Sequence, residues 1–238
     1  MAATVDLTGW GENGFRGNNN AGTWTVQPGN DTVRQTSNGQ PTVFFEPGSN
    51  AQGTSLSGSI EVYTTGDNDF VGFVLGYQDG ELNSANADFW LIDWKQANQD
   101  VAKIGLSLNH VTGNVAGTSV NDFWQHVGTV DEVARGAGLG STGWADNQSY
   151  TFDLIFTPTL IQVDVDGVNQ LSYTSADHGS TFTDGAFGFY NYSQGSVEYA
   201  GITSAVVPPS PVPLPATLPL LMAGFGALGL MRRRRRAA

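Results

Sequence analysis

The stretch DNDFVGFVLGYQ, residues 67–78, decides the fold class of this chain. Its first three residues form a polar, acidic turn, and residues 70–77 form an apolar run. A short apolar run that follows a turn of this kind is typical of a strand in a buried sheet. We therefore predict a β-strand over residues 70–77.

Working outward, the flanking segments follow the same pattern of strand, turn and strand. Residues 161–171 alternate around Asp166-Gly167, which is the strongest short-range signal for a β-hairpin. Further strands are predicted over four segments: residues 54–64, 87–94, 150–156 and 185–192. The sequence thus favours a sheet protein with many short strands.

The composition agrees with an all-β fold. The chain has 31 Gly, 13 Phe, 7 Tyr and 6 Trp but only 13% charged residues, which favours strands and tight turns over amphipathic helices. No long run of helical period, fixed repeat or low-complexity segment divides residues 1–205. We expect these residues to form one β-sandwich whose core is filled by aromatic side chains.

Charge and cysteine content narrow the classes of partner. The formal net charge is −12, and five of the ten basic residues form the run Arg232–Arg236, so the rest of the chain is more acidic still. Such a surface repels phosphate groups, so nucleic acid is excluded as a partner and divalent cations are favoured. Solubility explains the many acidic residues equally well. The absence of cysteine excludes disulfides and thiol catalysis.

The C-terminal part differs from everything before it. Residues 206–215 are a proline-rich linker, and residues 216–231 carry no charge and precede Arg232, Arg233, Arg234, Arg235 and Arg236. This order predicts that residues 216–238 are a short transmembrane helix, over residues 216–231, followed by the arginine cluster as a cytoplasmic anchor. A buried core helix is the alternative, but a run of arginines could not be buried behind it.

The same tail resembles the PEP-CTERM family of sorting signals in its VPLPA variant. The resemblance rests on an apolar stretch and an arginine cluster that follow Val212, Pro213, Leu214, Pro215 and Ala216. It implies export, a transient inner-membrane intermediate, processing by an exosortase, and a Gram-negative cell surface or matrix rich in exopolysaccharide. Because Ala2-Ala3 is similar to residues that flank a cleavage site, we expect an N-terminal signal upstream of the printed chain.

Several segments in order resemble the C-terminal, L-type-lectin-like domain of thrombospondins, over about residues 10–203. The similar segments are GTWTV at 22–26, VRQT at 33–36, DNDFVGFVLGYQ at 67–78, FWLIDWKQ at 89–96, GW at 143–144, SY at 149–150 and GFYNYSQ at 188–194. The resemblance implies a concanavalin-like jelly-roll sandwich and an adhesion module that binds calcium. Asn191 stands where the family often has a cysteine.

The acidic turn is the candidate metal site. Asp67, Asn68 and Asp69 offer oxygen ligands in a loop between strands, and calcium prefers six to eight oxygens. An ordinary polar turn explains the same residues equally well from spacing alone. The thrombospondin resemblance, whose family binds calcium, favours calcium.

Trp90 and Trp94 are the candidate glycan contacts. They share one parity along the strand predicted at residues 87–94, so both face the same side. Packing in the core is the favoured alternative, because large aromatic side chains stabilise most when buried.

No catalytic set is visible. The three histidines, His110, His126 and His178, fit no metal-binding spacing, and neither a nucleophile elbow nor a phosphate-binding loop occurs. The sequence therefore predicts a non-enzymatic adhesion or binding module at the cell surface. An exopolysaccharide-binding lectin is the first alternative and a polysaccharide hydrolase a weaker one.

Overall fold

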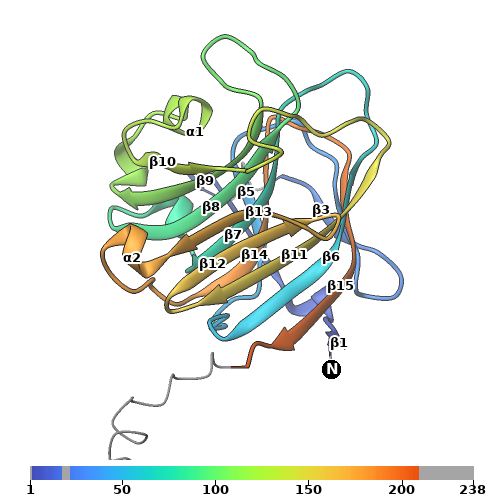
Figure 1. Ribbon diagram of the computed structural model, residues 1–238. Coiled ribbons are helices and arrows are strands. Elements are labelled where there is room, and N and C mark those ends of the chain that lie inside the picture. The colour runs from blue at the N-terminus through green and yellow to red at the C-terminus, as the bar shows by residue number, and fades with distance from the viewer. Residues whose placement is uncertain (1, 18–21, 209–238) are drawn as a thin grey trace, which may run out of the picture. The chain divides into compact units, whose positions relative to one another are not determined.

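The computed structural model describes residues 2–17 and 22–208, and these residues form a two-layered β-sandwich (Figure 1). The chain divides into a compact unit, Met1–Val207, and a second unit, Pro208–Ala238. The predicted linker, the VPLPA motif and the apolar span with its arginines lie almost wholly outside the described residues. Among the described residues, no helix is long and apolar enough to cross a membrane.

Sheet A has the strand order β13-β12-β11-β6-β15-β4-β3, and β1 pairs with the far end of β15. Its strand pairs are antiparallel. The bounds of its strands are β1 Ala3–Thr4, β3 Trp24–Val26, β4 Val33–Gln35, β6 Thr54–Val62, β11 Ser149–Thr157, β12 Leu160–Val165, β13 Val168–Thr174 and β15 Val197–Val206.

Sheet B has the order β10-β9-β8-β7-β14-β5-β2, again antiparallel. Its strands are β2 Gly11–Gly14, β5 Thr42–Phe45, β7 Phe70–Tyr77, β8 Ala87–Lys95, β9 Gly105–Gly113, β10 Val130–Arg135 and β14 Ala186–Tyr192. The helical turns are short: η1 Leu7–Gly9, η3 Glu81–Asn83, η4 Val115–Gly117, α1 Asn121–Gln125 and α2 Ser175–His178.

The inner core lies between the sheets. Because successive side chains of a strand point to opposite faces, Trp90, Ile92 and Trp94 of β8 point inward, where they join residues of sheet A such as Leu56 and Phe152. Phe73 and Phe152, from opposite sheets, have ring centroids 4.5 Å apart. Aromatic pairs of this kind join the two layers.

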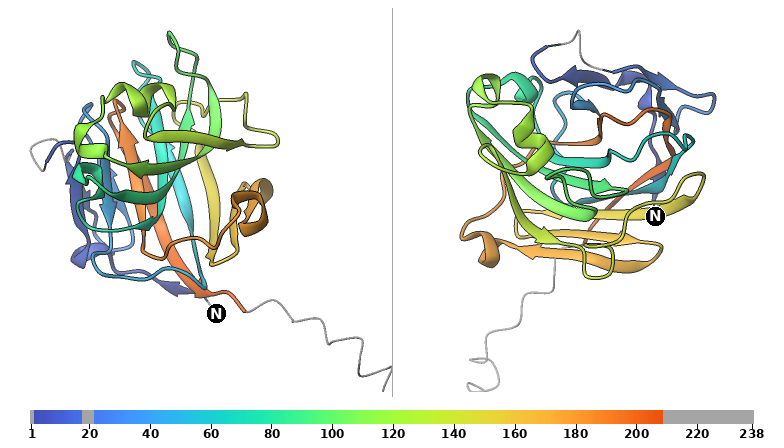
Figure 2. Two further views of the ribbon diagram at one scale, coloured as in Figure 1. Left: turned by 90° about the vertical axis from the view of Figure 1, so that its left-hand side faces the viewer. Right: turned by 90° about the horizontal axis from the view of Figure 1, so that it is seen from above.

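A second, outer core covers the other face of sheet B. Phe89 and Leu91 of β8 point there, as does Tyr190 of β14, and the loops bring Leu82 and Phe123 over them. Figure 2 shows α1 lying against sheet B on the side away from sheet A. Sheet B is thus buried on both faces, which explains why residues 70–77 are an unbroken apolar run.

The predicted strands agree with the observed ones. The run at residues 70–77 is β7, and the segments at 54–64, 87–94, 150–156 and 185–192 correspond to β6, β8, β11 and β14. The predicted hairpin is β12 and β13, joined by Asp166 and Gly167. The all-β fold class is therefore confirmed.

Candidate functional site

The acidic turn before β7 binds a lysine of the neighbouring strand. Lys95, at the end of β8, lies opposite Phe70 in the β7–β8 ladder, which carries its side chain to the turn. Its Nζ donates to Asp69 Oδ1 at 2.6 Å and contacts Asn68 O at 3.2 Å and Asn68 Oδ1 at 3.3 Å. The Lys95 side chain has no solvent exposure. Two of the three predicted metal ligands thus already bind a cation that belongs to the chain.

Two aromatic rings complete the surroundings of this ammonium group. Lys95 Nζ lies 5.0 Å from the ring centroid of Phe70 and 4.6 Å from that of Trp124, distances at which a cation is attracted to a ring face. Gln99 Oε1 lies 3.3 Å from the same atom. The buried charge is therefore balanced by one carboxylate, amide and carbonyl oxygens, and two rings.

Asp67 is not among the hydrogen-bond partners of Lys95. Its carboxylate accepts a hydrogen bond from Asn38 Nδ2. Partial burial, with the neighbouring carboxyl group of Asp69, raises the pKa of Asp67 to about 6. Because burial and the neighbouring Asp69 make the charged form of Asp67 costly, a positive charge close by would stabilise the ionised carboxylate.

The described residues do not contain a ready-made metal cluster. Nowhere in residues 2–17 and 22–208 do three or more His, Cys, Asp or Glu side chains gather closely enough to hold a metal ion. An ion at the acidic turn would have the carboxyl groups of Asp67 and Asp69 as its acidic ligands. Amide, backbone and water oxygens would have to complete a calcium shell.

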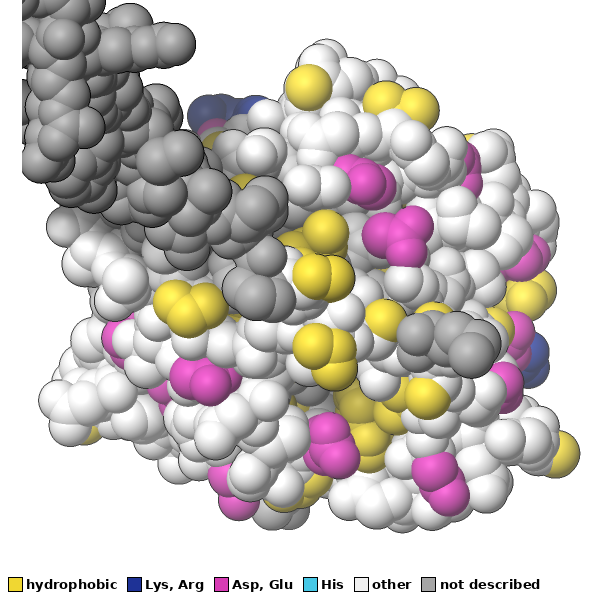
Figure 3. All heavy atoms as spheres, turned by 60° about the horizontal axis from the view of Figure 1, so that its bottom comes forward, with side chains coloured by type: hydrophobic (Ala, Val, Ile, Leu, Met, Phe, Trp, Pro, Cys, Tyr) yellow, Lys and Arg dark blue, Asp and Glu magenta, His cyan; other side chains and the backbone are white. Residues whose placement is uncertain are grey.

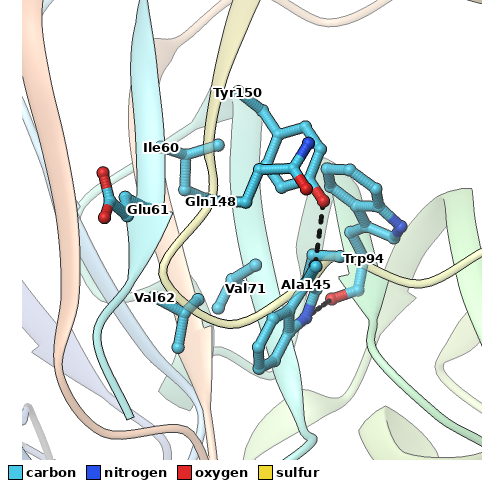
Figure 4. A pocket seen from close by; sticks show the side chains of 9 residues that line it. Ile60, Glu61, Val62, Val71, Trp94, Ala145, Gln148 and Tyr150 are labelled. Carbon is cyan, nitrogen blue, oxygen red and sulfur yellow. Dashed lines mark hydrogen bonds between the residues drawn. The ribbon is translucent and has the colours of Figure 1, made fainter. Parts of the chain in front are cut away.

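The acidic turn is joined to Trp94 through Trp144. The indole Nε1 of Trp144 lies 3.2 Å from Asp69 O and 3.1 Å from Trp94 O, and Trp94 Nε1 donates to Thr142 O at 2.8 Å. Figure 4 shows Trp94, Val71 and Tyr150 around a narrow apolar pocket at this end of the sandwich, where the hydroxyl of Tyr150 accepts from Ala145 N. The structure thus brings Trp94, but not Trp90, to the end of the sandwich that holds the acidic turn.

The predicted glycan contacts themselves have little exposed surface. Trp90 is 2% exposed and Trp94 is 4% exposed, and both lie in the inner core. Trp90 stacks on His110 with ring centroids 4.3 Å apart. A glycan platform at these two residues stays a prediction, and their burial favours the core-packing alternative.

A buried charged network fixes α1 to the outer face of sheet B. His126, directly after α1, has Nε2 2.9 Å from Asp93 Oδ2 and Nδ1 3.3 Å from Glu132 Oε2. Arg135 donates to both oxygens of Glu132, and Ser107 Oγ donates to Asp93. Burial alone would lower the pKa of His126, but the two carboxylates outweigh it and raise the pKa to about 9. His126 is therefore a charged, structural residue, which its spacing in the sequence did not reveal.

Comparison with known protein families gives two matches along the chain. The thrombospondin C-terminal region matches residues 19–206, and the PEP-CTERM protein-sorting motif matches residues 211–236. These are the two resemblances expected from the sequence, in the same order. The sorting motif lies in the part of the chain that the structure does not describe.

Among curated proteins, the chain is similar to parts of longer animal proteins. It is 25% identical to the cartilage oligomeric matrix protein of Homo sapiens over 195 residues, which cover 75% of this chain and 25% of that protein. It is 26% identical to thrombospondin-2 of Mus musculus over 199 residues, or 75% of this chain and 16% of the relative. The chain thus spans a quarter or less of the length of these relatives.

Among solved structures, the sandwich is similar to two sugar-binding domains. The carbohydrate binding module CBM66 from Bacillus subtilis matches with a TM-score of 0.56 and 11% identity over 83% of this chain and 95% of the module. The exoplasmic domain of VIP36 in its Ca²⁺/Man3GlcNAc-bound form matches with a TM-score of 0.55 and 12% identity over 89% of this chain and 91% of that domain. At these identities the likeness establishes the fold, an L-type-lectin-like sandwich.

Proposed function

Because the chain belongs to the thrombospondin C-terminal region family, we propose that it is an exported surface or matrix protein whose sandwich is an adhesion module that binds glycans. The observation that carries this proposal is the order of the two matched segments, a lectin-like sandwich followed directly by a sorting motif. The exopolysaccharide of the cell's own surface is the glycan we expect. The sugar-binding domains that share the fold support this ligand class.

Sorting by an exosortase is the second part of the proposal. The tail from Val212 to Arg236 would hold the exported chain in the inner membrane until cleavage near the proline motif releases it to the surface of a Gram-negative cell. Replacing both Pro213 and Pro215 by Ala should leave the chain uncleaved and membrane-bound in its native host. Release of the double variant at the wild-type size and rate would contradict this role of the motif.

Calcium binding at the acidic turn is the third part. The raised pKa of Asp67 and the nearby carboxyl group of Asp69 support a cation there. Lys95 limits what the site can offer, because it engages Asp69 Oδ1 and Asn68 Oδ1. A bound ion would stabilise the turn and would not take part in any bond-breaking step.

We propose binding without catalysis. One network resembles a catalytic set and consists of Asp93, His126 and Glu132. The Asp93 side chain is fully buried and that of His126 almost so, so a polymeric substrate cannot reach them. A polysaccharide hydrolase is the weaker alternative. If the purified chain releases reducing ends from any polysaccharide, the hydrolase alternative is favoured. The control is a preparation from cells with the vector alone, which should release none.

A glycan array with and without EDTA tests the function as a whole. We expect the full chain to bind at least one polysaccharide or oligosaccharide from the host's surface, and we expect chelation to weaken the binding if the acidic turn holds calcium. Binding to no glycan under either condition would contradict the lectin-like role. Binding that EDTA leaves unchanged would retain that role and contradict calcium dependence.

A further inference from the structure

A cleft of about 390 Å³ opens at the end of the sandwich where β1 meets β15, far along the strands from the acidic turn. Its volume lies within the range of about 300–1,000 Å³ that is usual for small-molecule sites. The N-terminal segment, the loop after β5, the start of β6 and the end of β15 contribute to its walls. Figure 3 brings this end forward and shows apolar side chains between separate carboxylates.

The floor of the cleft is apolar and partly aromatic. Trp10, Leu56 and Phe187 line it, and the ring of Trp10 is held in place by stacking on Phe189 with centroids 5.4 Å apart. The indole Nε1 of Trp10 is shielded from solvent and has no hydrogen-bond partner among the residues that the structure describes.

The rim offers hydrogen-bonding groups that the fold does not use. Glu46, Asn50, Thr4 and Ser204 line the cleft, and within the described part of the chain their side chains make no hydrogen bond. Together they supply a carboxylate, an amide and two hydroxyl groups. Glu46 and Asn50 lie on the exposed loop after β5, so neither is needed for the core.

We propose that this cleft is a saccharide-binding subsite that takes one or two neutral sugar rings, an inference that rests on the proposed glycan-binding function. A sugar ring has apolar C–H faces and a rim of hydroxyl groups, which matches an aromatic floor with acceptors and donors around it. A metal ion fits worse, because the cleft is lined by two carboxylates, Asp6 and Glu46, and Asp6 already accepts two hydrogen bonds from Thr8. The cleft is distinct from the acidic turn and from Trp90 and Trp94.

The test uses the full chain, kept in solution with a polyoxyethylene detergent, because alkyl glycoside detergents carry sugars of their own. The probes are neutral disaccharides of glucose, mannose, galactose and fructose, with binding measured by calorimetry. We expect at least one to bind, and Glu46→Ala/Asn50→Ala to weaken it by about tenfold or more, since two polar contacts are lost. The matched control is Asp164→Ala/Asn169→Ala, which removes an acid and an amide from the outer face of sheet A and should leave the dissociation constant unchanged.

A second measurement locates the ligand. Because the chain has no cysteine, Asn50→Cys provides a single thiol at the cleft and Asn169→Cys a control thiol elsewhere. The bound disaccharide should slow thiol labelling at position 50 and not at position 169.

If the wild type binds a saccharide and neither the cleft variant nor the labelling changes, the cleft assignment is overturned while the lectin-like function stands. If no probe and no arrayed glycan binds, both are overturned.

Discussion

Lys95 is the residue on which the acidic turn most depends. Lys95→Met should lower the free energy of unfolding by about 3 kcal/mol or more, because it leaves Asp69, itself 3% exposed, as a buried charge without its partner. Adding Asp69→Leu should restore much of the loss, since a pair of apolar residues needs no counter-charge. Urea denaturation of the two variants and the wild type measures this.

A surface ion pair provides the control for Lys95. Arg34 and Glu198 are 2.7 Å apart, but the Arg34 side chain is 42% exposed. Arg34→Met should therefore cost less than about 1 kcal/mol. A loss in Lys95→Met that is no larger than the loss in Arg34→Met would mean that the ammonium group is not held as the structure has it.

His126 makes the stability of the fold depend on pH. Its pKa is raised from 6.5 to about 9, so the protonated imidazole stabilises the folded state fully below pH 6.5. This stabilisation, of the order of 3 kcal/mol, is lost as the pH rises from 6.5 to 9. The pKa of Glu132 is lowered from 4.5 to about 2, chiefly by its hydrogen bond to His126, so its contribution is lost as the pH falls from 4.5 to 2. The melting temperature measured at a series of pH values from 6.5 to 9 should fall as the stabilisation by His126 is lost.

His126→Gln is the matched variant, since it keeps a polar side chain but does not titrate. Its melting temperature should be lower than that of the wild type at pH 6.5 and should change less between pH 6.5 and 9. Asp67 does not obscure this window, because the effect of its raised pKa ends near pH 6. Equal slopes in variant and wild type would assign the pH dependence to other groups.

At the scale of elements, the turn of the β12–β13 hairpin requires a glycine. Asp166 and Gly167 both have positive φ, 50° and 71°. Two positive φ values in succession match the right-handed twist of the flanking strands; aspartate tolerates the first of them, and glycine is favoured at the second. Gly167→Ala should destabilise the fold by about 1 kcal/mol.

The control for Gly167 is Gly39, which has no positive φ and nothing near its added methyl group. Gly39→Ala should change stability by less than about 0.5 kcal/mol. Chemical denaturation compares the two, and equal effects would contradict the role of the turn.

The strands that could be predicted from the sequence are those whose side chains follow one simple pattern. β7 is apolar throughout because both its faces are buried, and the hairpin is marked by its turn. β9, β10 and β15 escaped prediction, as did the short strands β1 to β5. On β9, Ser107 and Asn109 face the outer core as fully buried polar residues, so its alternation looks like that of a solvent-exposed strand.

The site was predicted only in part, for a related reason. Asp67, Asn68 and Asp69 are adjacent in the chain, so their clustering is visible in the sequence. The partner Lys95 comes from the next strand, and the order of strands in space decides that contact. Trp10 and Glu46 of the cleft meet in the same way, through folding, and no local spacing marks them.

At the scale of the whole molecule, calcium should raise the melting temperature if the acidic turn binds it. A ligand that binds only the native state at a hundredfold excess over its dissociation constant adds about 2.7 kcal/mol. Asp67→Ala should remove most of that gain, and magnesium should give less of it because it requires a smaller, octahedral site. Differential scanning calorimetry of the full chain and of Asp67→Ala, each with calcium, magnesium or EDTA, measures these changes in melting temperature.

The two outcomes that contradict this prediction differ in meaning. If the melting curves coincide in calcium and EDTA, residues 67–69 are a polar turn without a metal ion, and its role is to bind Lys95. A calcium gain that Asp67→Ala retains would place the ion elsewhere in the sandwich.

Burial of sheet B on both faces has a consequence for how the molecule opens. The amide hydrogens of β7 and β8 lie under two hydrophobic layers, whereas β12 and β13 at the edge of sheet A have one face in water. Deuterium should therefore enter β12 and β13 through local fraying and reach β7 and β8 only when the whole domain unfolds. Exchange measured by mass spectrometry would divide the sandwich into a fast layer and a slow one, and the slow layer is the one that holds the acidic turn in place.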